Sequence, residues 1–113
     1  MTKVDEKILE NDFMTLRSVE GRVIALIKVE KLDHESSMAI RTLFEQQPEV
    51  VGGRTVELDL SHVQFAASTA IGQLIHLNKL LKKRGKILIL SNLTSAMEEL
   101  ASVTKLDRLI KIK

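Results

Sequence analysis

Apolar and polar positions in the first half of the chain predict two strands followed by a helix. Residues 13–19 have the pattern of a strand, and residues 22–29 contain an apolar run without polar alternation, which is typical of a buried central strand. Asp33 can cap a helix that runs to about Gln47, because an aspartate side chain accepts hydrogen bonds from the first helical turn. Pro48 then breaks this helix.

The second half of the chain alternates strand and helix patterns. Residues 55–60 place apolar side chains on every second position and predict a third strand. Residues 68–84 have apolar side chains at helical spacing, and Gly85 stands where a glycine commonly ends a helix. Residues 86–90 form another nearly continuous apolar run, which predicts a fourth strand.

A last helix and the overall order of elements complete the predicted fold. Ser95-Ala-Met-Glu98 has the form of a capping box and is expected to open a helix through Val103. The order β-β-α-β-α-β-α predicts an α/β fold, with a small, mixed, mostly parallel four-stranded sheet and helical crossovers. We expect residues 1–113 to form a single domain.

Composition narrows the function classes. The chain is 44% hydrophobic and 28% charged, and no apolar stretch approaches the length of a membrane span, so no membrane insertion is expected. The absence of cysteine excludes disulfides and thiolate chemistry. A net charge of +2, with three phenylalanines as the only aromatic residues, does not indicate nucleic-acid binding. The first residues lack the apolar stretch of a secretory signal, so we expect a cytoplasmic protein.

A pair of hydroxyl residues, Ser68 and Thr69, stands where the helix of residues 68–84 is expected to begin. The first turn of a helix has N–H groups without helical partners and lies at the positive end of the helix dipole, so a phosphate on either hydroxyl would be tolerated there. The alternative is that Ser68 is only an N-cap, or lies in a turn, at the start of the helix, since serine is among the preferred capping residues.

Several segments of the sequence resemble those of a known family. The residues concerned are Leu58-Asp-Leu-Ser-His-Val-Gln-Phe65, the small and hydroxyl residues 66–70, Ile71-Gly72, Lys86-Ile-Leu-Ile-Leu90 and the ending Thr104-Lys-Leu-Asp-Arg-Leu-Ile-Lys-Ile112. Their order and spacing resemble STAS domains, which are the bacterial anti-sigma-factor antagonists and their relatives.

The resemblance implies a protein that works by binding. Such an antagonist captures an anti-sigma factor, often a serine kinase, and is released when that kinase phosphorylates it; a phosphatase can be a further partner. The family's phosphoacceptor falls on Ser68, with Thr69 as the second choice. This chain departs from the family pattern at Ala67, where an acidic residue is usual, and at Ala70 and Glu30, where glycines are usual.

A protein partner is expected to contact the region around the hydroxyl pair. Small side chains at Ala66 and Ala67 would let the partner's backbone approach closely, and polar side chains would supply the other contacts. The expected partner-binding residues are Gln64, Ala66, Ala67, Thr69, Gln73 and His76. An alternative, favoured by Ala67, is a scaffold that is not phosphorylated and serves a transporter or a signalling complex.

The sequence supports no enzyme, metal site or cofactor. No nucleophile, base and orienting acid occur at recognisable spacing, so no catalytic residue is expected. His34, His62 and His76 lack the spacing of metal ligands. Gly52-Gly53-Arg54 lacks the ending of a phosphate-binding loop.

Asp59 is expected to be a solvated or capping carboxylate, and the cationic cluster is expected to be solvated and to complement the helix dipole. That cluster consists of Lys79, Lys82, Lys83, Arg84 and Lys86.

Overall fold

Six strands form the main sheet, in the order β1-β2-β3-β5-β7-β8. The computed structural model describes residues 5–51 and 55–113, so the Gly52-Gly53-Arg54 segment lies outside the described residues. Strands β1, β2 and β3 pair antiparallel, and β3, β5, β7 and β8 pair parallel. The strands are β1 (Asp5–Glu10), β2 (Met14–Val19), β3 (Arg22–Ile27), β5 (Thr55–Asp59), β7 (Leu88–Ser91) and β8 (Lys111–Ile112).

The predicted α/β fold with a mixed, mostly parallel sheet is confirmed, but the expectation of four strands is wrong. The two additional strands lie at the edges of the sheet. Strand β1 has the sequence DEKILE and β8 has only two residues, so neither carries a strong apolar pattern. Each is a strand because its backbone pairs with a neighbour, β1 with β2 and β8 with β7.

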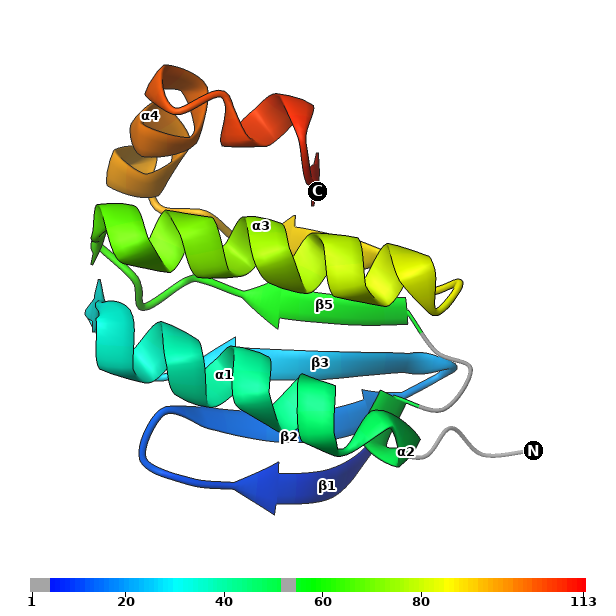
Figure 1. Ribbon diagram of the computed structural model, residues 1–113. Helices are drawn as coiled ribbons and strands as arrows, with labels where there is room; N and C mark the ends of the chain where they lie inside the picture. The colour runs from blue at the N-terminus through cyan, green and yellow to red at the C-terminus, as the bar shows by residue number, and fades with distance from the viewer. Residues whose placement is uncertain (1–4, 52–54) are drawn as a thin grey trace.

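The helices join successive parallel strands. Helices α1 and α3 lie side by side over one face of the sheet (Figure 1). Helix α4 lies on the other side of α3 from α1, next to the C-terminal segment. The helices are α1 (His34–Gln46), the single turn α2 (Pro48–Val51), α3 (Ser68–Lys83), α4 (Ser95–Val103) and the 3₁₀ turn η1 (Leu106–Arg108).

A row of small and aliphatic side chains crosses the helix-covered face of the sheet. Leu16, Ala25, Leu58 and Leu90 are direct neighbours on β2, β3, β5 and β7, and each side chain is fully buried. The residue before Leu58 on β5 faces the other way: Glu57 is buried, but its carboxylate accepts from Arg22 Nη1 at 2.9 Å. Alternation along β5 thus separates the core from an ion pair on the opposite face.

A polar side chain joins the end of α3 to the end of α1. The guanidinium of Arg84, just after α3, donates to the carbonyl oxygens of Phe44 at 3.0 Å and Glu45 at 3.2 Å. These carbonyls belong to the last turn of α1, where they have no helical partners. Arg84 is exposed, as expected, but it also has a structural role that the sequence did not indicate.

The helix ends follow the sequence closely, with one shift. Asp33 caps α1 through a hydrogen bond from Ser36 N, as expected, and Gly85 ends α3 with a φ of +74°, a conformation that glycine adopts without strain. Helix α4, however, is capped by Thr94, whose side chain accepts from Met97 N, so the assignment of Ser95 as the cap is wrong by one residue.

Candidate functional site

A two-stranded parallel sheet positions the chain immediately before α3. Strand β6 (Phe65–Ala66) pairs with β4 (Lys31–Leu32), which directly precedes α1. Gln64 N donates to Glu30 O at 2.7 Å, and Ala67 N donates to Leu32 O at 2.9 Å. Backbone hydrogen bonds therefore hold the beginnings of α1 and α3 next to each other, independently of side-chain identity.

Ala67 occupies the N-cap of α3. Its backbone is extended, with φ −69° and ψ 159°, and its side chain cannot cap. The N–H groups of Ala70 and Ile71 both donate to Ala67 O, at 2.9 and 3.0 Å. The alternative that Ser68 is the N-cap is therefore wrong: Ser68 is the first helical residue, and Thr69 is the second.

The two hydroxyl side chains at the start of α3 are exposed. Among residues 5–51 and 55–113, neither hydroxyl is engaged in a hydrogen bond. The first turn of α3 has no acidic residue, so nothing within it neutralises the positive end of the helix dipole. The site thus offers accessible hydroxyls at a helix N-terminus whose own first turn carries no acid.

The other expected contact residues do not all lie on one surface. Gln64, Thr69 and His76 are exposed and Ala67 is half-buried. Ala66 is only 3% exposed, so its methyl group belongs to the core and supplies no surface. The side chain of Gln73 is half-buried and accepts from Nε of Arg41 on α1, so it helps to join the two helices.

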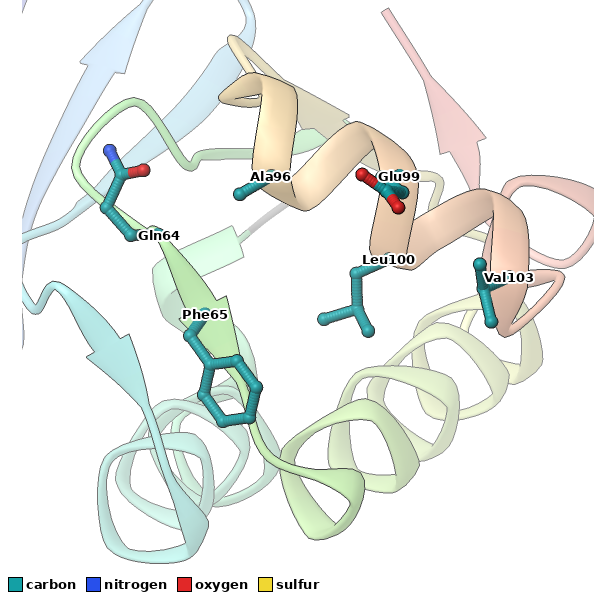
Figure 2. Close-up of a pocket in the computed structure, with 6 residues that line it drawn as sticks. All are labelled: Gln64, Phe65, Ala96, Glu99, Leu100 and Val103. Atoms are coloured by element: carbon teal, nitrogen blue, oxygen red, sulfur yellow. The ribbon is translucent and has the colours of Figure 1, made fainter.

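A hollow of about 220 Å³ lies beside this junction (Figure 2). Phe65 and Gln64 of the β6 segment lie on one side, and Ala96, Glu99, Leu100 and Val103 of α4 lie on the other. Phe65 is 50% exposed and Val103 is 73% exposed, so two exposed apolar side chains lie at the same hollow. The Lys31 ammonium lies 5.7 Å from the centre of the Phe65 ring. This apolar hollow was missed by the sequence analysis, because its two walls are about thirty residues apart in the chain.

The remaining polar candidates have structural positions. Asp59 accepts from Ser61 N at 3.0 Å and from Asn92 Nδ2 at 3.1 Å, so its carboxylate joins the loops that follow β5 and β7. Within the part of the chain that the structure describes, no three His, Asp or Glu side chains are grouped as metal ligands. The three histidines lie at the start of α1, in the loop after β5 and on the exposed side of α3.

The sequence of this chain matches a protein-family model. The model described as "Mlab, STAS domain" matches residues 15–111, which is most of the chain. The chain belongs to the STAS family. This confirms the resemblance seen in the sequence, and the STAS domain here places Ser68 and Thr69 at the start of α3.

Solved structures share the fold of this STAS domain. TM1081 of Thermotoga maritima, a candidate anti-sigma factor antagonist, is 24% identical with a TM-score of 0.74, over 88% of this chain and 84% of that chain. The phosphorylated form of the Bacillus cell fate determinant SpoIIAA is 18% identical with a TM-score of 0.65, over 88% of this chain and 90% of that chain. The murine anion transporter Slc26a9 is 21% identical with a TM-score of 0.66, over 78% of this chain and 14% of the transporter.

No curated protein matches the sequence of this STAS domain. Among the described helices, none is both long enough and apolar enough to cross a membrane.

Proposed function

We propose that this STAS domain is a non-enzymatic, cytoplasmic binding module that captures an anti-sigma factor with serine kinase activity and is released when Ser68 is phosphorylated. Such a protein would act in a partner-switching circuit that regulates transcription. The single observation that carries the proposal is the exposure of the Ser68 and Thr69 hydroxyls at the first turn of α3, without a hydrogen-bond partner among the described residues. A kinase could reach either oxygen without unfolding the helix.

The chemistry of the site supports release by phosphorylation. A phosphate brings about −1.5 to −2 charges and three acceptor oxygens to a position that is now neutral. The N–H groups of Ser68 and Thr69 have no helical partner, so the fold can accommodate the new charge locally. A partner docked over the same turn would instead meet added bulk and charge. SpoIIAA, which shares the fold, has been solved in unphosphorylated and phosphorylated forms.

A second candidate function is a scaffold that binds its partner permanently. Two observations favour it: Ala67 stands where antagonists carry an acidic residue, and a segment of the transporter Slc26a9 has the same fold. In this function Ser68 is never modified, and the partner is a transporter or a signalling subunit.

Two measurements separate these functions. The native protein is isolated and its peptide containing Ser68 and Thr69 is examined by mass spectrometry for one added phosphate. Proteins captured from a lysate of the native cell by the immobilised wild-type chain are then quantified for the Ser68→Ala and Ser68→Asp variants. We expect the Ser68→Ala variant to capture as much kinase as the wild type. The Ser68→Asp variant should capture about tenfold less or lower still, which corresponds to a loss of about 1.4 kcal/mol or more in binding free energy.

A matched control is available on α4. Ser95 is also an exposed first residue of a helix, so Ser95→Asp makes the same change of charge at an equivalent position. We expect this variant to capture the kinase like the wild type. If the peptide carries no phosphate and both Ser68 variants bind like the parent, the switch is wrong and the scaffold is retained.

A further inference from the structure

The outward side of α3 forms a continuous exposed ridge. Ser68, Gly72, His76, Lys79 and Lys83 recur at helical spacing, and each is exposed. We call these five residues the α3 ridge. At about 1.5 Å per residue, the ridge extends roughly 22 Å from the hydroxyl site to the end of the helix. Gln73, on one flank of the helix, is bonded to Arg41 of α1. The ridge is therefore the side of α3 left for a partner.

The α3 ridge has a single sign of charge. Residues 60–97 include no Asp or Glu, whereas they contain all five members of the cationic cluster. Arg84 is held by the carbonyl groups of α1, but in the described parts of the chain Lys79 and Lys83 have no ion-pair partner. On the neighbouring helix α1, Glu45 is paired with Arg41 at 3.0 Å.

The helix dipole accounts for only part of this pattern. A helix selected to complement its dipole would carry acids in its first turn as well as cations in its last turn. Helix α3 has cations in its last turn and no acid in its first. Lys79 precedes the last turn and so lies where the dipole effect has fallen off. The uniform charge is therefore better explained by a ligand than by helix stability.

Gly72 gives an independent sign of close approach. It lies inside α3, where glycine destabilises a helix relative to alanine. Nothing lies within 4 Å of the Cβ that an alanine would add there, so packing within the chain does not require glycine. The missing side chain leaves a flat place on the ridge, at which another backbone can come close.

From this charge and shape we infer that the α3 ridge binds an acidic, helical segment of a protein partner. Acidic side chains of that segment would pair with Lys79 and Lys83, and its backbone would pass over Gly72. A hollow of about 230 Å³ between the basic side chains would receive one apolar side chain; it is lined by His76, Lys79, Leu80 and Lys83. A segment of about four turns would match the length of the ridge.

Other anionic partners fit the ridge less well. The ridge carries no Phe, Tyr or Trp on which bases could stack, and two lysines make few phosphate contacts. Binding in a membrane interface requires apolar side chains that insert among the lipids. The large exposed apolar side chains lie on other elements: Ile8, Phe65, Ile87, Val103 and Leu109.

This inference deepens the proposed function and rests on it only in that the chain works by binding a protein. A phosphate on Ser68 would lie at one end of the same ridge and would repel an acidic segment that extends over the first turn. The negative charge of the partner's segment would therefore explain why phosphorylation releases the partner.

A peptide titration tests the ridge without involving phosphorylation. The probe is an alanine-rich helical peptide of about 20 residues with a glutamate at every turn of one face. It is added to the ¹⁵N-labelled full chain, and amide shifts are followed by NMR. We expect shifts concentrated at Gly72, His76, Lys79 and Lys83 that weaken as salt is added. The same peptide with lysine at each glutamate position should cause no such shifts.

Matched variants make the test specific. Lys79→Glu with Lys83→Glu should weaken binding of the acidic peptide by about tenfold or more. Arg108→Glu with Lys111→Glu changes the net charge equally, on exposed residues of η1 and β8, and should bind like the wild type. The inference is overturned if both double variants weaken binding equally, if the ridge amides do not shift, or if duplex DNA or anionic vesicles bind the ridge and the acidic peptide does not.

Gly72→Ala provides a readout that a purely structural glycine would not give. Alanine should raise the urea midpoint of unfolding, because it favours the helix. It should at the same time weaken binding of the acidic peptide, because the added methyl group lies in the path of the approaching backbone. A variant that gains stability and keeps full peptide affinity would contradict the role of Gly72. Because the peptide test does not depend on Ser68, it can fail while phosphorylation is still detected, and the reverse also holds.

Discussion

The Thr94 hydroxyl donates a hydrogen bond of 2.8 Å to the carbonyl oxygen of Val63, in the loop that leads to β6. Thr94 Oγ1 also accepts a hydrogen bond from Met97 N at 3.3 Å and so caps α4. One side chain thus joins the start of α4 to the loop before Phe65, and these two segments form the two walls of the apolar hollow. The separation of the walls therefore depends on a hydroxyl outside the hollow.

Replacing Thr94 by valine should destabilise the protein. The change keeps the shape of the side chain but removes the helix cap and leaves the Val63 carbonyl without its donor, so we expect a loss of about 2 kcal/mol in the free energy of unfolding. Thr94→Ser keeps the hydroxyl and should retain most of the stability. Urea unfolding at neutral pH measures both variants. Equal stability of the valine and serine variants would show that the hydroxyl does not connect these segments.

Replacing Phe65 by alanine should affect partner capture more than stability. The ring is 50% exposed, so we expect its removal to cost only about 1 kcal/mol of folding free energy, well below the cost for a buried phenylalanine. If the partner covers the hollow beside α3, capture of the kinase should fall about tenfold or more.

Ile87 provides the control for Phe65. It is 53% exposed and precedes β7, away from the residues that line the hollow, so Ile87→Ala removes a comparably exposed apolar side chain. It should leave capture unchanged. Equal capture by the two alanine variants, measured by quantitative pull-down, would exclude the hollow from the interface.

Acid should remove the contribution of the Asp33 cap. Hydrogen bonds from the backbone N–H and the hydroxyl of Ser36 lower the pKa of Asp33, because they favour the charged carboxylate. A carboxyl group whose pKa is lower in the folded state stabilises the protein above its unfolded pKa of about 4, and this stabilisation is lost as the pH falls through the folded pKa.

The Asp33→Asn variant isolates this effect, since asparagine also caps helices but does not titrate. The stability difference between wild type and variant, measured by urea unfolding, should be constant near neutral pH and shrink below about pH 4. Glu10, whose pKa is lowered by hydrogen bonds from Lys7 and Lys28, is present in both proteins and cancels in the difference. A difference that does not change with pH would mean that the charge of Asp33 contributes nothing.

Local patterns were sufficient for the elements with strong periodicity. Strands β2 and β3, helix α1 with its Asp33 cap, and helix α3 with its Gly85 end all agree with the sequence predictions within a few residues. Their apolar positions recur with the period of the element, and their ends carry residues with a specific local role. Strands β1 and β8 had no such pattern, because an edge strand is defined by the backbone groups of its neighbour.

The candidate site was predicted in part. The sequence placed Ser68 and Thr69 at the start of a helix, but the exposure of their hydroxyls depends on which side of α3 packs against the sheet and α1. Ala66 and Gln73 were expected at the surface; Ala66 is instead buried, and Gln73 is bonded to α1. The same small or polar residue type occurs in both environments, so its identity alone does not specify its surroundings.

The amino-acid sequence by itself determined the α/β order, the family, the hydroxyl pair at the start of a helix and the uniform charge of α3, because each depends on local patterns and on their order along the chain. Tertiary structure alone decided the six-stranded sheet, the β4–β6 pairing that positions Ala67, and the apolar hollow between Phe65 and α4. These features arise where segments distant in sequence meet, and their backbone and side-chain contacts form only when the whole chain has packed.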